Sequence, residues 1–592
     1  MSGNTLLGLL ARAAASPSHG IRFLDRKERA TFYPYADLLE RARRSASWLK
    51  RSGVTPGDHV ALILPTGVEF FDVFFGAMIC GAIPTPLYPP IRLGRLDEYH
   101  ERTSAMLRGC DARLVVTNRR IHRILGRTIE RCPLKLGVRI IEDVRLTDYD
   151  AADLPRLNAN STAFIQFSSG TTAAPKPIQL SHRSILANVE VIDGQIFTAY
   201  PERELGFEHS CVSWLPLYHD MGLVGCVFVS MARPRTLTLM GPDVFLGRPG
   251  MWLRALSRYR GTVSPAPNFA YSLCARRVRD PELAGVDLSA WRVALNGAEP
   301  VSAPVLREFV ERFSPYGFRK ESLTPVYGMG EATLAVTFSC LRSSWRQQRF
   351  DRQRLAEERT ASVSPDGELE LVSVGPPLPG YAVQIREDDV VLPEGSLGEC
   401  WIRGPSLMSG YRNMDRENAR VWDGEWLNTG DCGFLYQGEL YLFGRTKDTI
   451  VLRGKNFAAQ DIEQALDGVA GVRQGCVAAV GVVGDTGEQL VVFVETHDGS
   501  DDARRRLVSE AEAAISARCA LSAEVISLDR GTLPRTSSGK ISRARARDQY
   551  LGRSLERPKA VSAVRMLGEV ARSIRAHRRA QRKLRGAESP GE

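Results

Sequence analysis

Two short loops rich in glycine and hydroxyl side chains constrain this chain more than any other feature of its sequence. The first reads Ser-Ser-Gly-Thr-Thr-Ala-Ala-Pro-Lys over residues 168–176, and the second reads Pro-Arg-Thr-Ser-Ser-Gly-Lys-Ile over residues 534–541. Loops of this composition offer backbone N–H groups, hydroxyls and a lysine cation to phosphate oxygens. Because the two loops stand far apart in one chain, they suggest a nucleotide held between two domains.

The length and composition of the chain fit a protein of two or three domains. Its 592 residues are too many for one core, and its content of 43% hydrophobic and 25% charged residues is typical of a soluble globular protein. The N-terminus lacks the pattern of a signal peptide, and the most apolar segment, residues 70–90, is too interrupted to span a membrane. Eleven cysteines without a CxxC pair fit buried thiols in a reducing cytosol. We therefore expect a cytoplasmic protein.

The net charge of +10 is concentrated at the C-terminus. Residues 551–592 carry eleven Lys/Arg and four Asp/Glu, a balance of +7, so the rest of the chain is close to neutral. A protein that binds nucleic acid would carry its positive charge over a fold-sized face. No nucleic-acid partner is therefore expected.

The order of apolar runs predicts an α/β fold for a large N-terminal domain, residues 1–446. A strand at 60–64 followed by a helix at 67–80 is typical of βαβ units with buried, mostly parallel sheets. Another strand, at 163–167, runs into the first loop, and a helix is expected from Ser181 onward. This strand, loop and helix would together form a phosphate site.

The remaining segments differ in character from these βαβ units. Residues 341–371 are polar and are interpreted as an insertion, and residues 396–446 have the patterns of a β-rich subdomain. Residues 447–550 predict a small, mobile α+β domain that carries the second loop. Residues 551–592 form a basic tail with a helix expected at 572–585.

Four further side chains have the chemistry of a nucleotide site. Asp431 and Arg445 flank the expected domain junction, where a carboxylate can accept both hydroxyls of a ribose and a guanidinium can support it. Tyr327 precedes Glu331 by one short turn, and its ring suits a purine face while the carboxylate suits Mg²⁺. Each signal is weak alone, since an aspartate at a strand end is more often a cap or turn residue. Together they point to one site.

In their order along the chain, these motifs resemble those of the adenylate-forming superfamily, which includes acyl-CoA synthetases, peptide-synthetase adenylation domains and firefly luciferase. The matches span nearly the whole chain, at residues 168–176, 327–331, 426–431, 444–448 and 534–540. In detail the chain is similar to the fatty acyl-AMP ligases, at residues 213–223, 267–271, 296–300 and 448–463. The polar segment 341–371 also falls where those ligases carry an insertion.

The resemblance implies a role for each matched residue. Lys540, Glu331 and His219 would be catalytic, although His219 could instead be a structural histidine in a turn. Lys540 would bridge the carboxylate and the α-phosphate, and Lys447 would be the hinge about which the small domain rotates. Mg²⁺ would be held by Glu331 with Thr171 or Thr172, and the implied cofactors are ATP and Mg²⁺. The residues expected to bind ATP or AMP are Ser168, Ser169, Gly170, Thr171, Thr172, Lys176, Gly297, Ala298, Glu299, Pro300, Tyr327, Gly328, Asp431 and Arg445.

The chain departs from the family pattern in two respects, one in the first loop and one at Gly330. In the first loop Ala173 and Pro177 stand in place of glycines, and Pro177 lacks the N–H group for one phosphate or backbone contact. Gly330 stands where those ligases often have alanine, which is expected to leave extra room beside the adenylate. Both departures bear on substrate detail more than on activity.

The implied activity is the ATP-dependent conversion of a fatty acid to an acyl-adenylate, followed by transfer to the phosphopantetheine thiol of an acyl carrier protein or a polyketide or peptide synthase. In that family the insertion is thought to hamper the domain movement that admits coenzyme A. The alternatives are an acyl-CoA synthetase of the same fold and a non-catalytic scaffold.

The segment after the small domain bears on the partners of the chain. It is too short for a fused carrier domain, so the carrier is expected in trans. The basic tail could steer an acidic carrier, contact a membrane surface, or be a solvated end.

Overall fold

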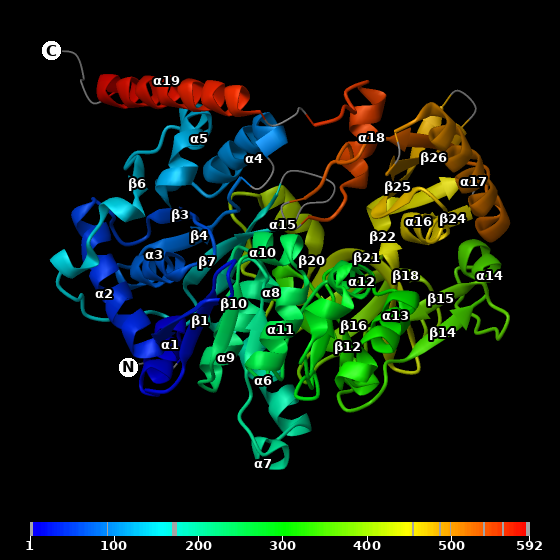
Figure 1. Cartoon of the computed structure of the whole chain (residues 1–592), viewed down its shortest axis with the longest axis horizontal. Coiled ribbons are helices and arrows are strands. Elements are labelled where there is room, and N and C mark those ends of the chain that lie inside the picture. The colour runs from blue at the N-terminus through cyan, green and yellow to red at the C-terminus, as the bar shows by residue number, and fades with distance from the viewer. Residues whose placement is uncertain are drawn as a thin grey trace.

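A parallel sheet with helices on both faces forms the centre of the first 150 residues (Figure 1). The computed structural model describes residues 4–90, 93–168, 175–452, 455–484, 487–497, 499–536, 539–558 and 562–587. The strand order is β4 (Ile83–Pro86), β3 (His59–Ile63), β5 (Ala112–Thr117), β6 (Val138–Ile140). Every residue of β3 is buried, as the sequence predicted for this strand. The helix α3 (Val68–Ile79) follows it, within the predicted range 67–80.

The alternation of side chains along β3 sends them into two separate cores. Val60 and Leu62 pack with the helices α2 (Tyr35–Arg51) and α3, whereas Ala61 and Ile63 pack with α4 (Leu96–Gly109) and α5 (Arg119–Arg131). A second sheet, with parallel pairing except at β1–β2, continues the larger core. Its strand order is β2 (Ala30–Pro34), β1 (Gly20–Leu24), β10 (Leu237–Met240), β9 (Cys211–Ser213).

The first glycine loop connects two antiparallel strands, which corrects the expected order of elements. Strand β7 (Thr162–Phe167) precedes the loop and β8 (Pro177–Ser181) follows it, so α6 (His182–Ala199) begins one strand later than a strand–loop–helix unit would place it. Ser181 caps α6 by accepting the N–H of Ser184 at 3.0 Å. Pro177 can begin β8 because it contributes only its carbonyl, which accepts the N–H of Arg412 at 2.9 Å.

The chain between α6 and residue 340 supplies further strands and helical segments besides β9 and β10. These strands are β11 (Ala294–Asn296), β12 (Leu323–Gly328) and β13 (Ala335–Phe338). The helical segments are α7 (Glu202–Leu205), α8 (Asp220–Gly222), η4 (Leu223–Phe228), α9 (Val229–Ala232), α10 (Pro242–Gly247), α11 (Gly250–Arg258), α12 (Asn268–Arg277) and α13 (Ala303–Phe313).

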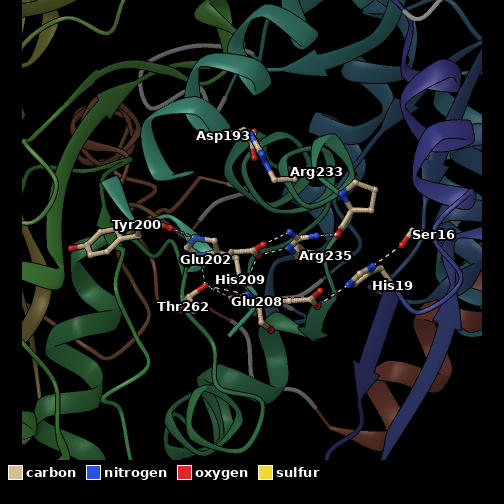
Figure 2. A network of polar contacts seen from close by, with 12 residues as sticks. Ser16, His19, Asp193, Tyr200, Glu202, Glu208, His209, Arg233, Arg235 and Thr262 are labelled. Carbon is tan, nitrogen blue, oxygen red and sulfur yellow. Dashed lines mark hydrogen bonds and ion pairs between the residues drawn. The ribbon is translucent and has the colours of Figure 1, made fainter. Parts of the chain in front are cut away.

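A polar network fixes α7 and the start of β9 (Figure 2). Glu202 accepts hydrogen bonds from Arg235 Nε at 2.5 Å and from the backbone N–H of His209 at 2.7 Å. His209 Nε2 donates to the carbonyl of Tyr200 at 2.7 Å, so Nδ1, 2.9 Å from the Thr262 hydroxyl, accepts. Burial lowers the pKa of His209, which keeps the ring neutral. The network is structural.

The polar segment 341–371 is an ordered hairpin with a short helix. It contains β14 (Gln347–Phe350), α14 (Arg352–Glu357) and most of β15 (Leu369–Val372). Phe350 and Leu355 are fully buried, which anchors the segment to the β-rich part of the chain. That part pairs β16 (Ala382–Glu387), β17 (Val390–Val391), β18 (Gly398–Arg403), β20 (Trp422–Asp423), β21 (Trp426–Tyr436) and β22 (Glu439–Arg445).

The C-terminal α+β unit has its own apolar core. Helices α16 (Ala459–Gln464) and α17 (Asp501–Cys519) bury residues such as Ile462 and Ile515 against the sheet β25-β26-β27. The other elements of this unit are β23 (Thr449–Leu452), β24 (Lys455–Ala458), β25 (Val472–Gly484), β26 (Gly487–Thr496), β27 (Glu524–Leu528) and α18 (Arg543–Leu551).

The basic tail contains a helix longer than the sequence predicted. Helix α19 runs from Ala563 to Ala587, whereas the expected helix began at residue 572. It leaves the C-terminal unit and lies beside α5 and α4 of the N-terminal part (Figure 1). Among the described residues, no helix combines the length and the apolar composition needed to cross a membrane.

Candidate active site

A cavity of about 2080 Å³ lies between the N-terminal part and the C-terminal unit, with lining side chains from both. The structure brings most of the predicted site residues together around it. Gly297 does not line the cavity, and Ser169, Gly170, Thr171 and Thr172 lie outside the described residues. The predicted residues that do line it are Ser168, Lys176, His219, Ala298, Glu299, Pro300, Tyr327, Gly328, Glu331, Asp431, Arg445, Lys447 and Lys540.

The lysine loop of the C-terminal unit presents Lys540 to this cavity. The N–H of Thr536 donates to the carbonyl of Lys540 at 2.7 Å, and Gly539 has a φ of +90°, a conformation that favours glycine. Arg535, which the sequence did not single out, donates to the carbonyl of Gly539 at 2.9 Å and so braces the turn. Burial, with the nearby Arg445 cation, lowers the pKa of Lys540, while the carboxylates of Glu299 and others oppose that shift.

Asp431 and Arg445 face each other across the pair β21–β22. Arg445 Nε donates to Asp431 Oδ1 at 3.1 Å, and the Tyr327 hydroxyl donates to Asp431 Oδ2 at 2.7 Å. The Asp431 charge raises the pKa of Arg445. Both oxygens of this carboxylate are therefore held in place, and each keeps a lone pair for a further donor such as a ribose hydroxyl. Tyr327 thus positions Asp431 as well as lining the cavity with its ring.

Glu331 lies beside a tyrosine that the sequence did not reveal. The Tyr411 hydroxyl donates to Glu331 Oε1 at 2.9 Å, and Lys176 Nζ lies 4.5 Å from the centre of the Tyr411 ring. Burial raises the pKa of Glu331, and the Tyr411 hydrogen bond, Arg445 and Lys176 counteract this. Burial lowers the pKa of Lys176. Lys176 also closes the base of the first loop, because its N–H donates to Ser168 Oγ at 3.0 Å.

His219 stands immediately before α8, at the cavity wall. Its Nδ1 lies 2.5 Å from Asp220 Oδ1. Burial alone would raise the pKa of Asp220, but His219, the N–H of Met221 and Lys540 together lower it. His219 therefore has an ionised partner. A Cβ at the neighbouring Gly330 would come within 3.0 Å of a methyl group of Ile178, so this position offers less room than we expected.

The 297–300 segment forms another wall of the cavity. Gly297 packs closely on β12, where a Cβ would meet the carbonyl oxygen of Val326 at 2.8 Å, and Ala298 has a φ of +67°. Glu299 accepts the N–H of Phe269 at 2.5 Å, and burial raises the pKa of Glu299. This turn places Ala298, Glu299 and Pro300 in the cavity wall while Gly297 stays behind it.

Three side chains that follow Lys447 in the sequence tie the C-terminal unit together. Lys447 is exposed in the short turn Thr446–Asp448. Arg543 donates to Asp448 Oδ2 at 3.0 Å and to both oxygens of Glu463, at 2.6 and 2.7 Å, and these two carboxylates raise its pKa despite burial. Because Arg543 follows the lysine loop closely, these hydrogen bonds tie that loop to the start of the C-terminal unit.

The insertion contacts the C-terminal unit directly. Arg352 of α14 pairs with Asp461 of α16, and Glu357 of α14 pairs with Lys455 of β24. Arg352 Nη1 also lies 3.6 Å from Cys519 Sγ. Burial raises the pKa of Asp461, and Arg352 opposes that shift. The polar character of this segment therefore corresponds to an interface between the insertion and the C-terminal unit.

The residues around Glu331 fit a magnesium ion that is carried mainly by phosphates. Among the described residues, no group of three or more His, Cys, Asp or Glu side chains could hold a metal ion alone. Mg²⁺ is commonly bound by one or two carboxylates together with substrate phosphates and water. Glu331, which is one of several carboxylates lining the cavity, can meet that requirement, whereas Thr171 lies outside the described residues.

The chain matches the model of the family described as "AMP-binding enzyme" over residues 10–412. It is 32% identical over 553 residues to the long-chain-fatty-acid–AMP ligase FadD26 of Mycobacterium bovis, covering 89% of this chain and 92% of that protein. It is also 32% identical over 546 residues to the 4-hydroxyphenylalkanoate adenylyltransferase of Mycobacterium marinum, covering 87% and 85%.

A solved structure from studies of fatty acyl-adenylate ligases of E. coli and L. pneumophila has the same fold. It matches with a TM-score of 0.86 at 33% identity and covers 93% of this chain and 98% of its own length. The predicted fold class, an α/β N-terminal domain with a smaller C-terminal domain, is confirmed, as is the predicted superfamily. The chain belongs to the AMP-binding enzyme family.

Proposed function

We propose that this protein activates a fatty acid with ATP to an acyl-adenylate and then transfers the acyl group to the phosphopantetheine thiol of a carrier protein acting in trans. The observation that carries the first half is the convergence of Lys540, from the C-terminal unit, with Asp431, Arg445 and Glu331, from the N-terminal part, on one cavity. Lys540 and Arg445 supply positive charge, which is needed to bring two anions together, and the reaction needs such charge more than a base. Asp431 and Glu331 would instead hold the ribose and the Mg²⁺ of the nucleotide.

In the first step a carboxylate oxygen attacks the α-phosphorus of ATP, and the bond from that phosphorus to the pyrophosphate oxygen breaks. Both reactants are already ionised at neutral pH, so no proton has to be removed. Lys540 would bridge the carboxylate and α-phosphate oxygens, and Asp431 with Arg445 would hold the ribose. Mg²⁺, when bound at Glu331, would neutralise phosphate charge.

In the second step the thiol sulfur attacks the acyl carbonyl, the carbon–oxygen bond to AMP breaks, and the thiol proton is released. Rotation about Lys447 would withdraw Lys540 and admit the acceptor. The carboxylic acid would lie along apolar side chains that also line the cavity, namely Ile192, Trp214, Met221, Leu273, Leu334 and Phe338. This lining supports an aliphatic or aryl-aliphatic acid.

A carrier thiol is favoured over coenzyme A by the contacts of the insertion. Arg352 and Glu357 each pair with the C-terminal unit in the arrangement that places Lys540 in the cavity. Those pairs oppose the rotation that either acceptor requires, and a carrier protein that contacts the enzyme surface would offset this cost with its own binding energy, whereas free coenzyme A makes fewer contacts. The fatty acyl-AMP ligase named among the relatives supports the same choice.

The free state of all eleven cysteines supports a reducing, cytoplasmic location.

The proposal is tested by following both products of the first step and both acceptors of the second. Pyrophosphate release and the mass of the acyl-adenylate should be measured across a panel of fatty and aryl-alkanoic acids. Coenzyme A and a phosphopantetheinylated carrier should then be offered side by side to the enzyme loaded with acyl-adenylate. Absence of pyrophosphate release with every acid would reject the enzyme and leave a scaffold, and faster thioester formation with coenzyme A would select the acyl-CoA synthetase.

A further inference from the structure

The inner face of α19 is built from small residues and fits closely against α5. Ser573, Ala576 and Ala580 are at most 2% exposed. The N–H of Gly126 donates to Ser573 Oγ at 2.7 Å, and a Cβ at Gly126 would lie 1.9 Å from the backbone oxygen of Ser573. Only glycine permits this approach. Within the basic tail, α19 is therefore a docked helix with one fixed orientation rather than a solvated end.

Buried polar contacts fix that orientation further. Glu569 is 3% exposed and lies 3.2 Å from His100 Nε2 and 3.4 Å from Arg127 Nη1. The rings of His577 and His122 stack with their centres 4.5 Å apart. These contacts on α4 and α5 determine which side of α19 faces outward.

The outer face of α19 has the reverse of the usual pattern, because its large aliphatic side chains point away from the protein. Val564 is 80% exposed, Leu567 is 70% exposed and Ile574 is 47% exposed. Their spacing of three and seven residues places them on one side of the helix. Residues of this type are normally buried, and a cluster of them on one surface indicates an interaction site.

Arginines continue the same outer face toward the C-terminus. Arg575, Arg578 and Arg582 are exposed and follow Ile574 on that side of the helix. The neighbouring helix α5 adds two exposed arginines, Arg120 and Arg123. Within α19 the sequence has one acidic residue, Glu569, and it faces inward. Glu130 of α5 pairs with Arg579 of α19 at 2.7 Å, beside these arginines. The outer face therefore combines aliphatic side chains with an excess of positive charge.

We propose that the outer face of α19 docks on the surface of an anionic phospholipid bilayer. Aliphatic side chains of a helix that lies flat enter the boundary between headgroups and acyl chains, while arginines pair with lipid phosphates. A helix of this length is about 37 Å long, and Figure 1 shows it along one edge of the molecule. A flat bilayer can contact such a ridge along its whole length, whereas an acidic carrier would use the arginines and leave the aliphatic residues unexplained.

This inference goes beyond the proposed catalytic function and does not depend on it, because lipid binding is measured without ATP or acid. The full chain is mixed with vesicles of phosphatidylcholine containing phosphatidylglycerol, and with vesicles of phosphatidylcholine alone, and the bound fraction is measured by co-sedimentation. Wild-type protein should bind the anionic vesicles far more tightly than the neutral ones.

Variants of the outer face separate its two contributions. Arg575→Gln and Arg578→Gln should each weaken binding about fivefold, from a contribution of roughly 1 kcal/mol per basic residue near an anionic surface. Leu567→Ser together with Ile574→Ser should weaken vesicle binding by at least about tenfold. The weak binding that remains should be electrostatic, so added salt should abolish it. Matched controls are Arg203→Gln, on α7 at the opposite end of the molecule (Figure 1), and Val390→Ser, at a valine that is 64% exposed on β17.

The result has clear consequences for the proposal. Retained pyrophosphate release and an unchanged melting temperature would show that each variant is folded. The proposal is overturned if wild-type protein does not bind the anionic vesicles at low salt, or if the controls lose as much binding as the variants. It is also overturned if the variants bind vesicles normally but acylate a holo-carrier more slowly, because the face would then receive a protein.

Discussion

The contact between Arg352 and Asp461 gives the sharpest prediction. Both side chains are about one-seventh exposed, at 14% and 13%, and the pair joins the insertion to the C-terminal unit. In Arg352→Gln, Asp461 is buried without a charged partner when the C-terminal unit contacts the insertion. In the rotated arrangement Asp461 would be in water, where the loss of the partner has no cost. The substitution should therefore destabilise the arrangement with Lys540 in the cavity relative to the rotated arrangement.

The size of this effect follows from the burial of the pair. Removing one partner of a fully buried ion pair costs about 3–5 kcal/mol. Because this pair keeps some contact with water, we expect about 2 kcal/mol, which shifts the equilibrium between the two arrangements by roughly 30-fold. If rotation limits access of coenzyme A, thioester formation with coenzyme A should rise by up to this factor.

The assay is single-turnover transfer from preformed acyl-adenylate to coenzyme A and to a holo-carrier, with pyrophosphate release measured separately. Arg354→Gln is the matched control, since Arg354 lies on the same helix, is 48% exposed and pairs with Glu358 immediately after the helix end. Asp461→Asn should reproduce the effect, and the double variant should show little further change. An unchanged ratio of coenzyme A to carrier transfer in Arg352→Gln, in an enzyme that still releases pyrophosphate, would refute the reasoning.

Three further predictions concern the cavity and the hinge. Lys540→Ala should slow adenylation by about 10²–10³-fold while transfer from added acyl-adenylate survives. Because the pKa of Lys540 is lowered, adenylation should decline at a lower pH than it would with an ordinary lysine. Lys540→Arg should move that decline to a higher pH. Equal loss of both steps in Lys540→Ala would make the residue structural. Asp431→Asn should raise the KM for ATP by about 10–100-fold through loss of a charged hydrogen bond, and an unchanged KM would remove Asp431 from the site. Lys447→Pro should preserve pyrophosphate release and abolish transfer, since proline fixes φ, and transfer at the wild-type rate would place the hinge elsewhere.

Features with a local signature were predictable from the sequence. The strand before the first loop, the capped start of α6 and the lysine loop each depend on residues close together in the chain. Strand β8 was missed because it begins with Pro177, which resembles loop sequence, although a first-position proline needs only its carbonyl. Tyr411 was missed because its contact with Glu331 joins residues 80 positions apart, and no local pattern announces it.

For two surface segments the sequence indicated the composition but not the neighbouring element that each segment contacts. The insertion looked polar because Arg352 and Glu357 serve the contact with the C-terminal unit, while its buried Phe350 and Leu355 are few. Helix α19 packs through Ser573 and alanines, while its large aliphatic residues are exposed. Hydrophobic periodicity would therefore predict the opposite face of the helix to be buried. In both segments the contacts join residues far apart in the chain, so no local pattern indicates them.

The return of α19 to the N-terminal part changes how the catalytic unit is joined to the rest of the molecule. A unit that is joined to the rest of the molecule by one connection would dissociate if the chain were cut there. Residues 449–551 are instead held at both ends, by the preceding chain and by α19, which packs on α5. The chain between Leu551 and Ala563 can span at most about 40 Å, which limits how far the lysine loop can travel. A protease nick near Lys447 should therefore leave two fragments that migrate as one particle until α19 is stripped from α5.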